Sequence, residues 1–178
     1  ILMCYNNIKS GVVMNKLIIL RGNSGSGKST VAKELQRYFG LHTLMISQDN
    51  VSRDMILALE GEDQEALPLF IHLLKFGHEN NKVTIMDGIF RKEKYEELLK
   101  LAKEMYGDNI YAYYFDLPFE ETLRRHQTRW KRSEFGEEEM KRWWSERDFI
   151  GFISEKIITQ EISKDEIVNL IINDIEKE

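Results

Sequence analysis

A glycine-rich octapeptide at residues 22–29 constrains this chain more than any other segment. It reads Gly-Asn-Ser-Gly-Ser-Gly-Lys-Ser and matches the pattern G-x-x-x-x-G-K-[ST]. Glycine permits positive φ angles and a close approach of the main chain to an anion, so successive N–H groups can cradle phosphate oxygens where a helix begins. Lys28 then supplies positive charge to the same oxygens, and Ser29 offers a hydroxyl to phosphate-bound Mg²⁺. The octapeptide predicts a site for a nucleoside triphosphate.

The residues on either side of the octapeptide agree with this interpretation. Residues 16–20, Lys-Leu-Ile-Ile-Leu, form an apolar run that is too short for a helix and rich in strand formers. Residues 30–39 carry apolar side chains at helical spacing, from Val31 to Phe39. A glycine-serine linker with an accidental lysine is the alternative, and it would not need these flanks. A strand, a phosphate-binding loop and a helix are therefore expected in this order.

Strands and helices alternate along the rest of the chain. Apolar runs predict further strands at residues 42–47, 82–87, 110–115 and 155–159. Helical patterns cover residues 51–59, 64–77, 92–105, 119–130 and 137–149, and a last helix is expected after Ser163, with Glu166 placed for a capping box. This alternation favours an α/β fold in which helices cover both faces of a parallel sheet. Ligands of such folds bind beyond the carboxyl ends of the strands, so the residues that follow each strand are the candidates for chemistry.

Composition narrows the class of protein. The chain has 178 residues and a net charge of −5, which indicates one domain, residues 14–178, without bulk attraction to nucleic acid or anionic membranes. No apolar run approaches the ~20 residues of a membrane span. The single cysteine, Cys4, excludes a disulfide framework and fits a reducing cytoplasm. Residues 1–13 are interpreted as an extension, with Met14 as the natural start, and nothing in the sequence indicates an oligomeric state.

Two pairs of charged residues follow the second and third predicted strands. Asp49 is positioned to orient or deprotonate an acceptor hydroxyl, although it could instead cap the next helix. Arg53 lies four residues later on the same helical face, where it can bind substrate or pair with Asp49. Asp87 can hold the waters of Mg²⁺ or bind the acceptor, although Asp-Gly is also a common turn. Arg91 can reach a phosphate or carboxylate of the substrate.

The strongest cationic run of the chain, residues 123–132, follows the fourth predicted strand. Arg125 and Arg129 are four residues apart and share a helical face, and Arg132 follows by three. These arginines predict a lid, at about residues 124–140, that stabilises charge on a transferring phosphoryl group. A solvated helix face neutralised by nearby glutamates is the alternative. The tryptophans of this region, Trp130, Trp143 and Trp144, can stack on a base or sugar, but packing is the favoured interpretation. The four histidines lack ligand spacing, so Mg²⁺ is expected to arrive with the nucleotide.

Taken together, these residues resemble the small P-loop kinases of the adenylate-kinase-like class. The likeness runs from Lys16 to the final helix and is strongest to the branch of zeta-toxin-type sugar-nucleotide kinases, chloramphenicol phosphotransferase and polynucleotide 5′-hydroxyl kinases. The segment Met-Ile-Ser-Gln-Asp-Asn, with Asp49 and the later Arg53, is similar to the strand-end aspartate and arginine of that branch, although the spacing is one residue longer than in polynucleotide kinases. Asp87 to Arg91 is similar to the Asp-Gly-Phe-Pro-Arg stretch of adenylate kinases, with Phe90 in the position of proline.

The resemblance implies a three-layer P-loop NTPase fold whose five parallel strands are ordered 2-3-1-4-5, with a small helical lid. It implies transfer of the γ-phosphoryl group of ATP, with Mg²⁺, to a hydroxyl of a small molecule such as a nucleoside, a sugar nucleotide or an antibiotic. No guanine-specific Asn-Lys-x-Asp run is present, so ATP is the expected nucleotide. A polynucleotide 5′-hydroxyl kinase, which the net charge does not favour, and a regulatory NTPase are the alternatives.

The expected site falls into four groups of residues. The residues expected to bind ATP are Gly22, Asn23, Ser24, Gly25, Ser26, Gly27, Lys28, Ser29, Thr30 and Arg132. The residues expected to act in catalysis are Lys28, Asp49, Arg125 and Arg129. The acceptor is expected to contact Asp49, Arg53, Asp87 and Arg91, and Mg²⁺ is expected at Ser29 and, through water, at Asp87.

Overall fold

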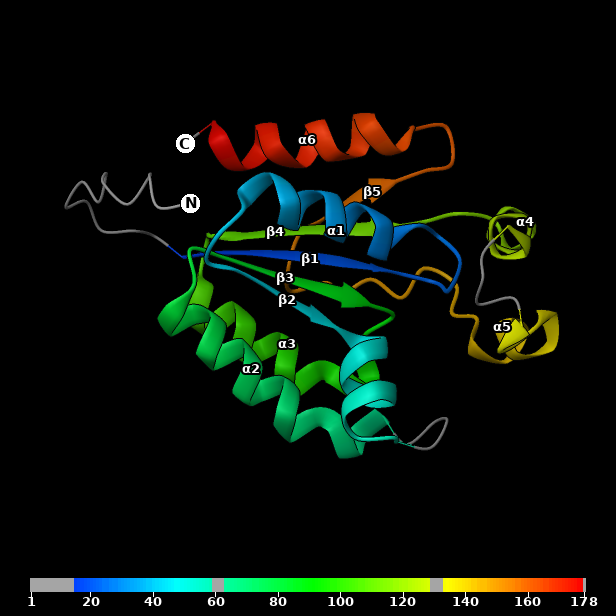
Figure 1. Cartoon of the computed structure of the whole chain (residues 1–178), viewed down its shortest axis with the longest axis horizontal. Coiled ribbons are helices and arrows are strands. Elements are labelled where there is room, and N and C mark those ends of the chain that lie inside the picture. Colours follow the sequence, from blue (N-terminus) through cyan, green and yellow to red (C-terminus); the bar gives the residue numbers. More distant parts are fainter. Residues whose placement is uncertain (1–14, 59–62, 129–132, 178) are drawn as a thin grey trace, which may run out of the picture.

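Five parallel strands form the centre of the protein. The computed structural model describes residues 15–58, 63–128 and 133–177. The strands are β1 (Lys16–Gly22), β2 (Thr43–Ser47), β3 (Val83–Gly88), β4 (Ile110–Phe115) and β5 (Glu155–Ile158). Their order in the sheet is β2-β3-β1-β4-β5, and every pairing is parallel (Figure 1). The predicted order of strands is therefore confirmed, and each predicted strand exists with bounds that shift by at most two residues.

Two helices cover each face of the sheet, which gives the three layers that the sequence predicts. Helices α1 (Lys28–Phe39) and α6 (Lys164–Glu176) lie on one face, and α2 (Leu67–Asn80) and α3 (Lys92–Tyr106) lie on the other (Figure 1). Strand β1 shows why both faces need cover, because its consecutive side chains alternate between two separate cores. Leu17 and Ile19 join the core beneath α2 and α3, whereas Ile18 and Leu20 join the core beneath α1 and α6.

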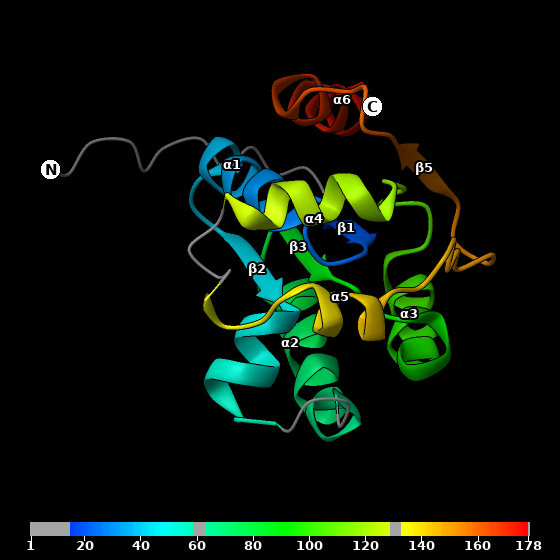
Figure 2. The ribbon, with the colours of Figure 1, turned by 90° about the vertical axis from the view of Figure 1, so that its right-hand side faces the viewer.

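Two short helices lie outside these layers, beyond the carboxyl ends of the strands. They are α4 (Phe119–Gln127) and α5 (Glu137–Trp143), and Figure 2 shows both in front of the strand ends. Residues 144–154, which we call the strap, lead from α5 back to β5. No helix in the described parts of the chain is long and apolar enough to cross a membrane. Helices α4 and α5 lie where a lid is expected, at the edge of the sheet that holds the ligand sites of this fold.

Three helix predictions need correction. The segment predicted at residues 51–59 is a π-helix, η1 (Asn50–Met55), and the segment predicted at 64–77 is a 3₁₀ turn, η2 (Asp63–Ala66), followed by α2. The helix predicted at 137–149 ends at Trp143. Its helical pattern continues, but the strap instead makes hydrogen bonds to distant strands and loops, and these outweigh local propensity. The helix predicted at residues 119–130 includes residues 129–130, which lie outside the described residues. Residues 1–13, which include Cys4, lie outside them as well.

The last helix begins as predicted. Ser163 precedes α6, and its hydroxyl accepts a hydrogen bond from the N–H of Glu166 at 3.3 Å. The Glu166 carboxylate in turn accepts from the N–H of Ser163 at 2.9 Å. This reciprocal pair satisfies two N–H groups that would otherwise lack partners at the start of the helix, so the capping box is confirmed.

Candidate active site

The loop between β1 and α1 has a backbone that favours glycine. Gly22 has a φ of +136°, and a Cβ atom there would lie 2.6 Å from the carbonyl oxygen of Phe115. Gly25 has a φ of +84°, and its Cβ would lie 2.5 Å from the carbonyl oxygen of Thr122. A side chain at either position would therefore collide with β4 or α4. The octapeptide is thus fixed in shape by its neighbours as well as by its own dihedral angles.

Lys28 begins α1 and lies over this loop. Its Nζ donates a hydrogen bond to the carbonyl oxygen of Asn23 at 2.7 Å and another to Ser26 Oγ at 3.0 Å. The residue is almost entirely buried, whereas Ser29 and Thr30, the next two residues, are exposed. A lysine held against a loop of N–H groups at the start of a helix concentrates positive potential at one point, which suits a polyphosphate.

Asp87 lies at the end of β3, next to the start of α1. It is 2% exposed, and burial raises the pKa of its carboxyl, while the hydroxyl of Ser29, the charge of Lys28 and the hydroxyl of Ser47 act in the opposite direction. Its Oδ1 atom has no hydrogen-bond partner among the described residues. An unsatisfied buried carboxylate oxygen beside a serine hydroxyl fits a hydrated Mg²⁺, because that ion takes oxygen ligands and keeps several waters. The predicted pair, Ser29 and Asp87, is brought together here.

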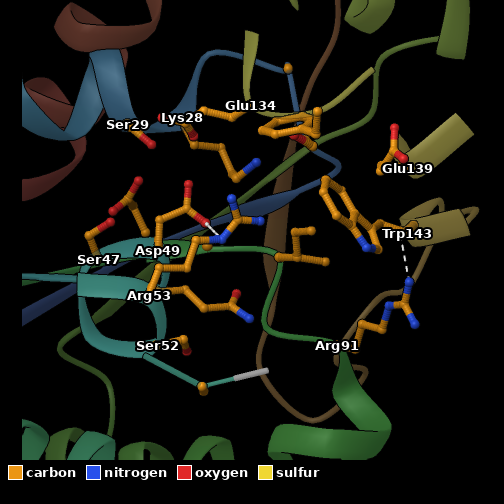
Figure 3. A pocket seen from close by; sticks show the side chains of 18 of the residues that line it. Lys28, Ser29, Ser47, Asp49, Ser52, Arg53, Arg91, Glu134, Glu139 and Trp143 are labelled. Atoms are coloured by element: carbon orange, nitrogen blue, oxygen red, sulfur yellow. Dashed lines mark hydrogen bonds and ion pairs between the residues drawn. The ribbon is translucent and has the colours of Figure 1, made fainter. Parts of the chain in front are cut away.

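The octapeptide forms one wall of a cleft of about 700 Å³. Figure 3 shows this cleft from close by, with Lys28 and Ser29 facing residues of η1 and the lid. Its lining includes all four residues expected to bind the acceptor, namely Asp49, Arg53, Asp87 and Arg91. It also includes Lys94, Arg142, Glu134 and Glu139, which were not among the predicted site residues. The structure therefore gathers the predicted donor and acceptor residues around a single space.

Asp49 and Arg53 form the rim of the cleft at η1. The side chain of Asp49 is half exposed and makes no hydrogen bond that caps the helix, so the alternative role as a helix cap is not seen. Arg53 Nε lies 3.9 Å from Asp49 Oδ1, as their spacing predicts. The π-helical turn that holds both residues is a rare conformation that often marks functional sites.

Two aromatic rings of the lid face Arg53. The centre of its guanidinium lies 5.6 Å from the ring of Phe135 and 5.4 Å from the ring of Trp143, within cation–π range (Figure 3). Trp143 packs edge to face on Phe135, with ring centroids 4.9 Å apart, as the favoured interpretation predicts, and it also lines the cleft. Trp144 does pack, edge to face, on Phe119 at 5.2 Å. Trp130 lies outside the described residues.

Arg91 enters the cleft from the loop after β3. Its Nη2 donates a hydrogen bond to the carbonyl oxygen of Trp143 at 2.6 Å (Figure 3). No carboxylate pairs with Arg91 within residues 15–58, 63–128 and 133–177. A half-buried guanidinium that meets a neutral carbonyl rather than an acid keeps most of its positive charge available to a ligand.

Arg125 is the lid arginine that reaches the octapeptide. Its Nη1 donates to the carbonyl oxygen of Ser26 at 3.1 Å, and its Nε donates to Glu121 at 2.6 Å. Hydrogen bonds from Arg124 and Arg125 lower the pKa of Glu121 to about 2, so Glu121 holds both arginines as a carboxylate at neutral pH. The other predicted lid arginines, Arg129 and Arg132, lie outside the described residues.

A second cavity, of about 630 Å³, lies on the other side of the octapeptide. Thr30, Arg125 and Thr128 form part of its wall, and residues 160–163, between β5 and α6, form another part together with Lys164 at the start of α6. Val31, Phe115 and Ile167 add apolar surface. A pocket with apolar walls and a few polar groups beside a phosphate-binding loop has the character of a nucleoside site.

Three polar residues near the site were not predicted in these roles. Arg21 and Gln48, which directly precede the octapeptide and Asp49, are buried. Asn23 uses its side chain to hold the strap through two hydrogen bonds with Ser145. The sequence carried one signal, because an arginine inside an apolar strand must find buried partners. The identity of those partners depends on contacts more than 60 residues apart, which no local pattern encodes.

Comparisons with known proteins give the family. Residues 17–149, most of the chain, match the model of an AAA domain family, AAA_33. No curated protein sequence matches the chain.

Several solved structures share the fold at low sequence identity. The structure of the APS kinase CysC of Mycobacterium tuberculosis, in complex with AMPPNP and APS, is 18% identical over 93% of this chain and 99% of that chain, with a TM-score of 0.63. A gluconokinase of Sinorhizobium meliloti 1021 is 16% identical over 92% and 93%, with a TM-score of 0.61. A shikimate kinase of Acinetobacter baumannii, in complex with shikimate, is 17% identical over 92% and 94%, with a TM-score of 0.60. The resemblance to small P-loop kinases is thus confirmed in fold, and the chain belongs to the AAA_33 family of AAA domains.

Proposed function

We propose that the protein transfers the γ-phosphoryl group of ATP to a hydroxyl of a small molecule. One observation carries the proposal, namely that a phosphate-binding loop and a half-exposed carboxylate, Asp49, line the same cleft. A switch protein that only binds and slowly hydrolyses a nucleotide has no need for a second, cationic half of the cleft. A phosphotransferase needs both halves, because its catalysis consists largely of positioning two substrates and stabilising charge between them.

On the donor side, the octapeptide and Lys28 would hold the β- and γ-phosphates, and the nucleoside would occupy the cavity beside Thr30 and Arg125. Ser29 and Asp87 would hold Mg²⁺, the latter through water, and the ion would neutralise charge on the phosphate oxygens. Arg125 already contacts the loop through Ser26, so a small shift of its guanidinium would bring it to the phosphates. Arg129 and Arg132 remain predicted partners of the same group.

On the acceptor side, Asp49 would accept the hydroxyl proton as the new bond forms. The acceptor oxygen bonds to the γ-phosphorus, the bond from that phosphorus to the β–γ bridging oxygen breaks, and ADP leaves. The proton ends on the Asp49 carboxylate and returns to water. Arg53 Nε, 3.9 Å from Asp49 Oδ1, would help to orient that carboxylate.

The charge of Arg91 favours an acceptor that carries an anionic group. Arg91 and Lys94 line the acceptor half of the cleft, and no carboxylate among the described residues pairs with Arg91. A phosphate or carboxylate on the acceptor would compensate this charge with bidentate hydrogen bonds. Nucleoside monophosphates, sugar nucleotides and sugar acids fit this requirement better than neutral nucleosides or uncharged antibiotics.

A transfer assay with γ-labelled ATP and Mg²⁺ tests the proposal. Pooled acceptors would comprise nucleosides, nucleoside monophosphates, sugar nucleotides, sugar acids, antibiotics and a 5′-hydroxyl oligonucleotide, each tested beside Asp49→Asn. We expect label in one pool, and loss of about 10²–10⁴-fold in transfer by the variant with ATP binding retained. Label released only as inorganic phosphate, equally in both proteins, would contradict the proposal and indicate a regulatory NTPase. Label on the oligonucleotide alone would move the function to a polynucleotide kinase.

A further inference from the structure

The two residues that flank Arg91 are both held by one ion pair, whose guanidinium is fully buried. Arg21 Nε donates to the carbonyl oxygen of Phe90 at 3.0 Å, and the N–H of Lys92 donates to Asp148 Oδ2 at 2.9 Å. Arg21 and Asp148 are themselves joined, Nη2 to Oδ2, at 2.7 Å. The main chain is therefore fixed immediately before and immediately after Arg91, by a pair that bridges β1 and the strap.

The backbone at Phe90 has a conformation that needs such support. Phe90 is fully buried and has a φ of +37°, which is unfavourable for a residue with a Cβ atom. A third contact fixes the same residue, because its N–H donates to Gln48 Oε1 at 2.9 Å. Strain of this kind persists only where the surrounding structure imposes it, and it concentrates at functional sites. Here the strained turn directs the next side chain, Arg91, into the cleft.

The burial of Arg21 is not explained by stability alone. Its side chain is 0% exposed and pairs with a second carboxylate, Glu155 Oε1, at 2.8 Å. Well-packed apolar residues often stabilise a fold as much as a buried ion pair does, so such a pair is weak evidence of a stabilising role. The fork of a guanidinium does what no apolar residue can, since it binds a carbonyl and two carboxylates in fixed directions. Its three contacts lead to the Phe90 turn, the strap and β5.

We propose that Arg21, Gln48 and Asp148 are positioning residues that aim Arg91 at the acceptor, and we call them the Arg91 clamp. The inference rests on the proposed function, since it assigns the clamp to acceptor binding in that reaction. One member of the clamp, Gln48, also lines the cleft directly before Asp49, and another, Asp148, belongs to the strap that Asn23 of the octapeptide holds at Ser145. The clamp acts on acceptor binding through Arg91 and leaves ATP binding to the loop.

Steady-state kinetics with Arg21→Lys and Asp148→Ala tests the clamp. The probe is the member of the acceptor panel that the wild type labels fastest. Arg21→Lys keeps the charge but cannot make the three forked contacts, and Asp148→Ala removes the partner of Arg21 and of the Lys92 N–H. We expect each variant to raise the KM for the acceptor by about 10-fold, with the KM for ATP changed less than about 2-fold. In an Arg91→Ala background the same substitutions should raise the acceptor KM no further, because their only route to the acceptor has gone.

Asp174→Ala provides the matched control. Asp174 is a comparably shielded acid that pairs with Lys156 at 2.6 Å and accepts from the Tyr113 hydroxyl at 2.8 Å, outside the lining of the cleft. This control should leave both KM values unchanged. Equal rises in the KM for the acceptor and the KM for ATP, or effects that add fully to that of Arg91→Ala, would overturn the clamp. Transfer by the wild type would still support the proposed function in that case. Absence of transfer by the wild type to every acceptor would overturn both. Asp148 is partly exposed, so Asp148→Ala still gives the answer should Arg21→Lys fail to fold.

Discussion

The two halves of the cleft are built in different ways. The donor half is built around eight consecutive residues, and their shape follows from glycine dihedral angles and from close packing against β4 and α4. The acceptor half is assembled from η1, the loop after β3, α3 and the lid, and it is held by long side chains that meet across the fold. A phosphate site can thus be specified by a short stretch of sequence, whereas the choice of acceptor depends on tertiary contacts.

The two halves of the cleft should respond differently to substitution. A loop whose donors are main-chain N–H groups should lose function when its one charged side chain is removed, because no other residue of the octapeptide carries a positive charge. An acceptor wall with several cations and aromatic rings should instead lose affinity in steps. Substitutions in the donor half are therefore expected to have larger effects than substitutions in the acceptor half.

The largest effect is expected for Lys28→Ala. The ammonium of Lys28 is the only lysine or arginine charge within the octapeptide, and its loss should lower transfer by about 10³-fold or more and abolish measurable ATP binding. Titration calorimetry with MgATP would measure the binding. Lys94→Ala removes a lysine from the acceptor half of the same cleft and should leave ATP affinity unchanged. Equal loss of ATP affinity in the two variants would show that the halves are not separate.

The second largest effect is expected for substitution of Arg91, and it should appear in the KM for the acceptor but not in the affinity for ATP. Arg91→Gln removes a charged hydrogen-bond donor and should raise the KM for an anionic acceptor by about 10–100-fold. Assays with matched pairs of acceptors, such as a nucleoside monophosphate and its nucleoside, would measure the preference for the anionic member in both proteins. The variant should lose most of that preference. A preference that survives in Arg91→Gln would assign recognition of the anion to another cation of the cleft.

Most of the donor half could be predicted from the sequence, but only part of the acceptor half could. The octapeptide and the shared helical face of Asp49 and Arg53 follow from local spacing, and the order of strands follows from the resemblance to small P-loop kinases. The structure agrees with each. The end of the lid helix at Trp143 could not be predicted, because the strap leaves the helix to reach partners on β1 and in the octapeptide. For the same reason the sequence suggested that Arg91 binds substrate but did not indicate how its backbone is held.

A smaller effect, on stability, is expected at the boundary between the halves. Burial raises the pKa of Asp87, so the unliganded fold binds a proton there more tightly than the unfolded chain does. The stabilisation from this protonated carboxyl is therefore fully present below the pKa of Asp87 in the unfolded chain. The free energy of unfolding should fall as pH rises from that value through the pKa of the folded state. Asp87→Asn removes the buried charge. A gain of about 1 kcal/mol would raise the Tm of the unliganded protein at pH 7 by about 2–4 °C.

Thermal unfolding at two pH values, with and without MgATP, distinguishes the loss of the buried Asp87 charge from a change in stability that does not depend on pH or ligand. The difference in Tm between Asp87→Asn and the wild type should be larger at pH 8 than at pH 5. MgATP should stabilise the wild type more than the variant, because Asp87 would help to hold the ion. A variant that unfolds at a lower temperature than the wild type at both pH values would show that the ionised carboxylate stabilises the unliganded site.

The smallest effect concerns the contact between the acceptor rim and the lid. The guanidinium of Arg53 faces Trp143, and an exposed pair of this type contributes about 0.5–1 kcal/mol. A double-mutant cycle of Arg53→Gln and Trp143→Leu should give a coupling of that size in kcat/KM for the acceptor, a factor of about 2–5, with little coupling in ATP affinity. Arg142 lines the same cleft and pairs with Glu139 at 3.6 Å, and Arg142→Gln provides the matched control. A coupling near zero would mean that the ring and the cation act on the acceptor separately.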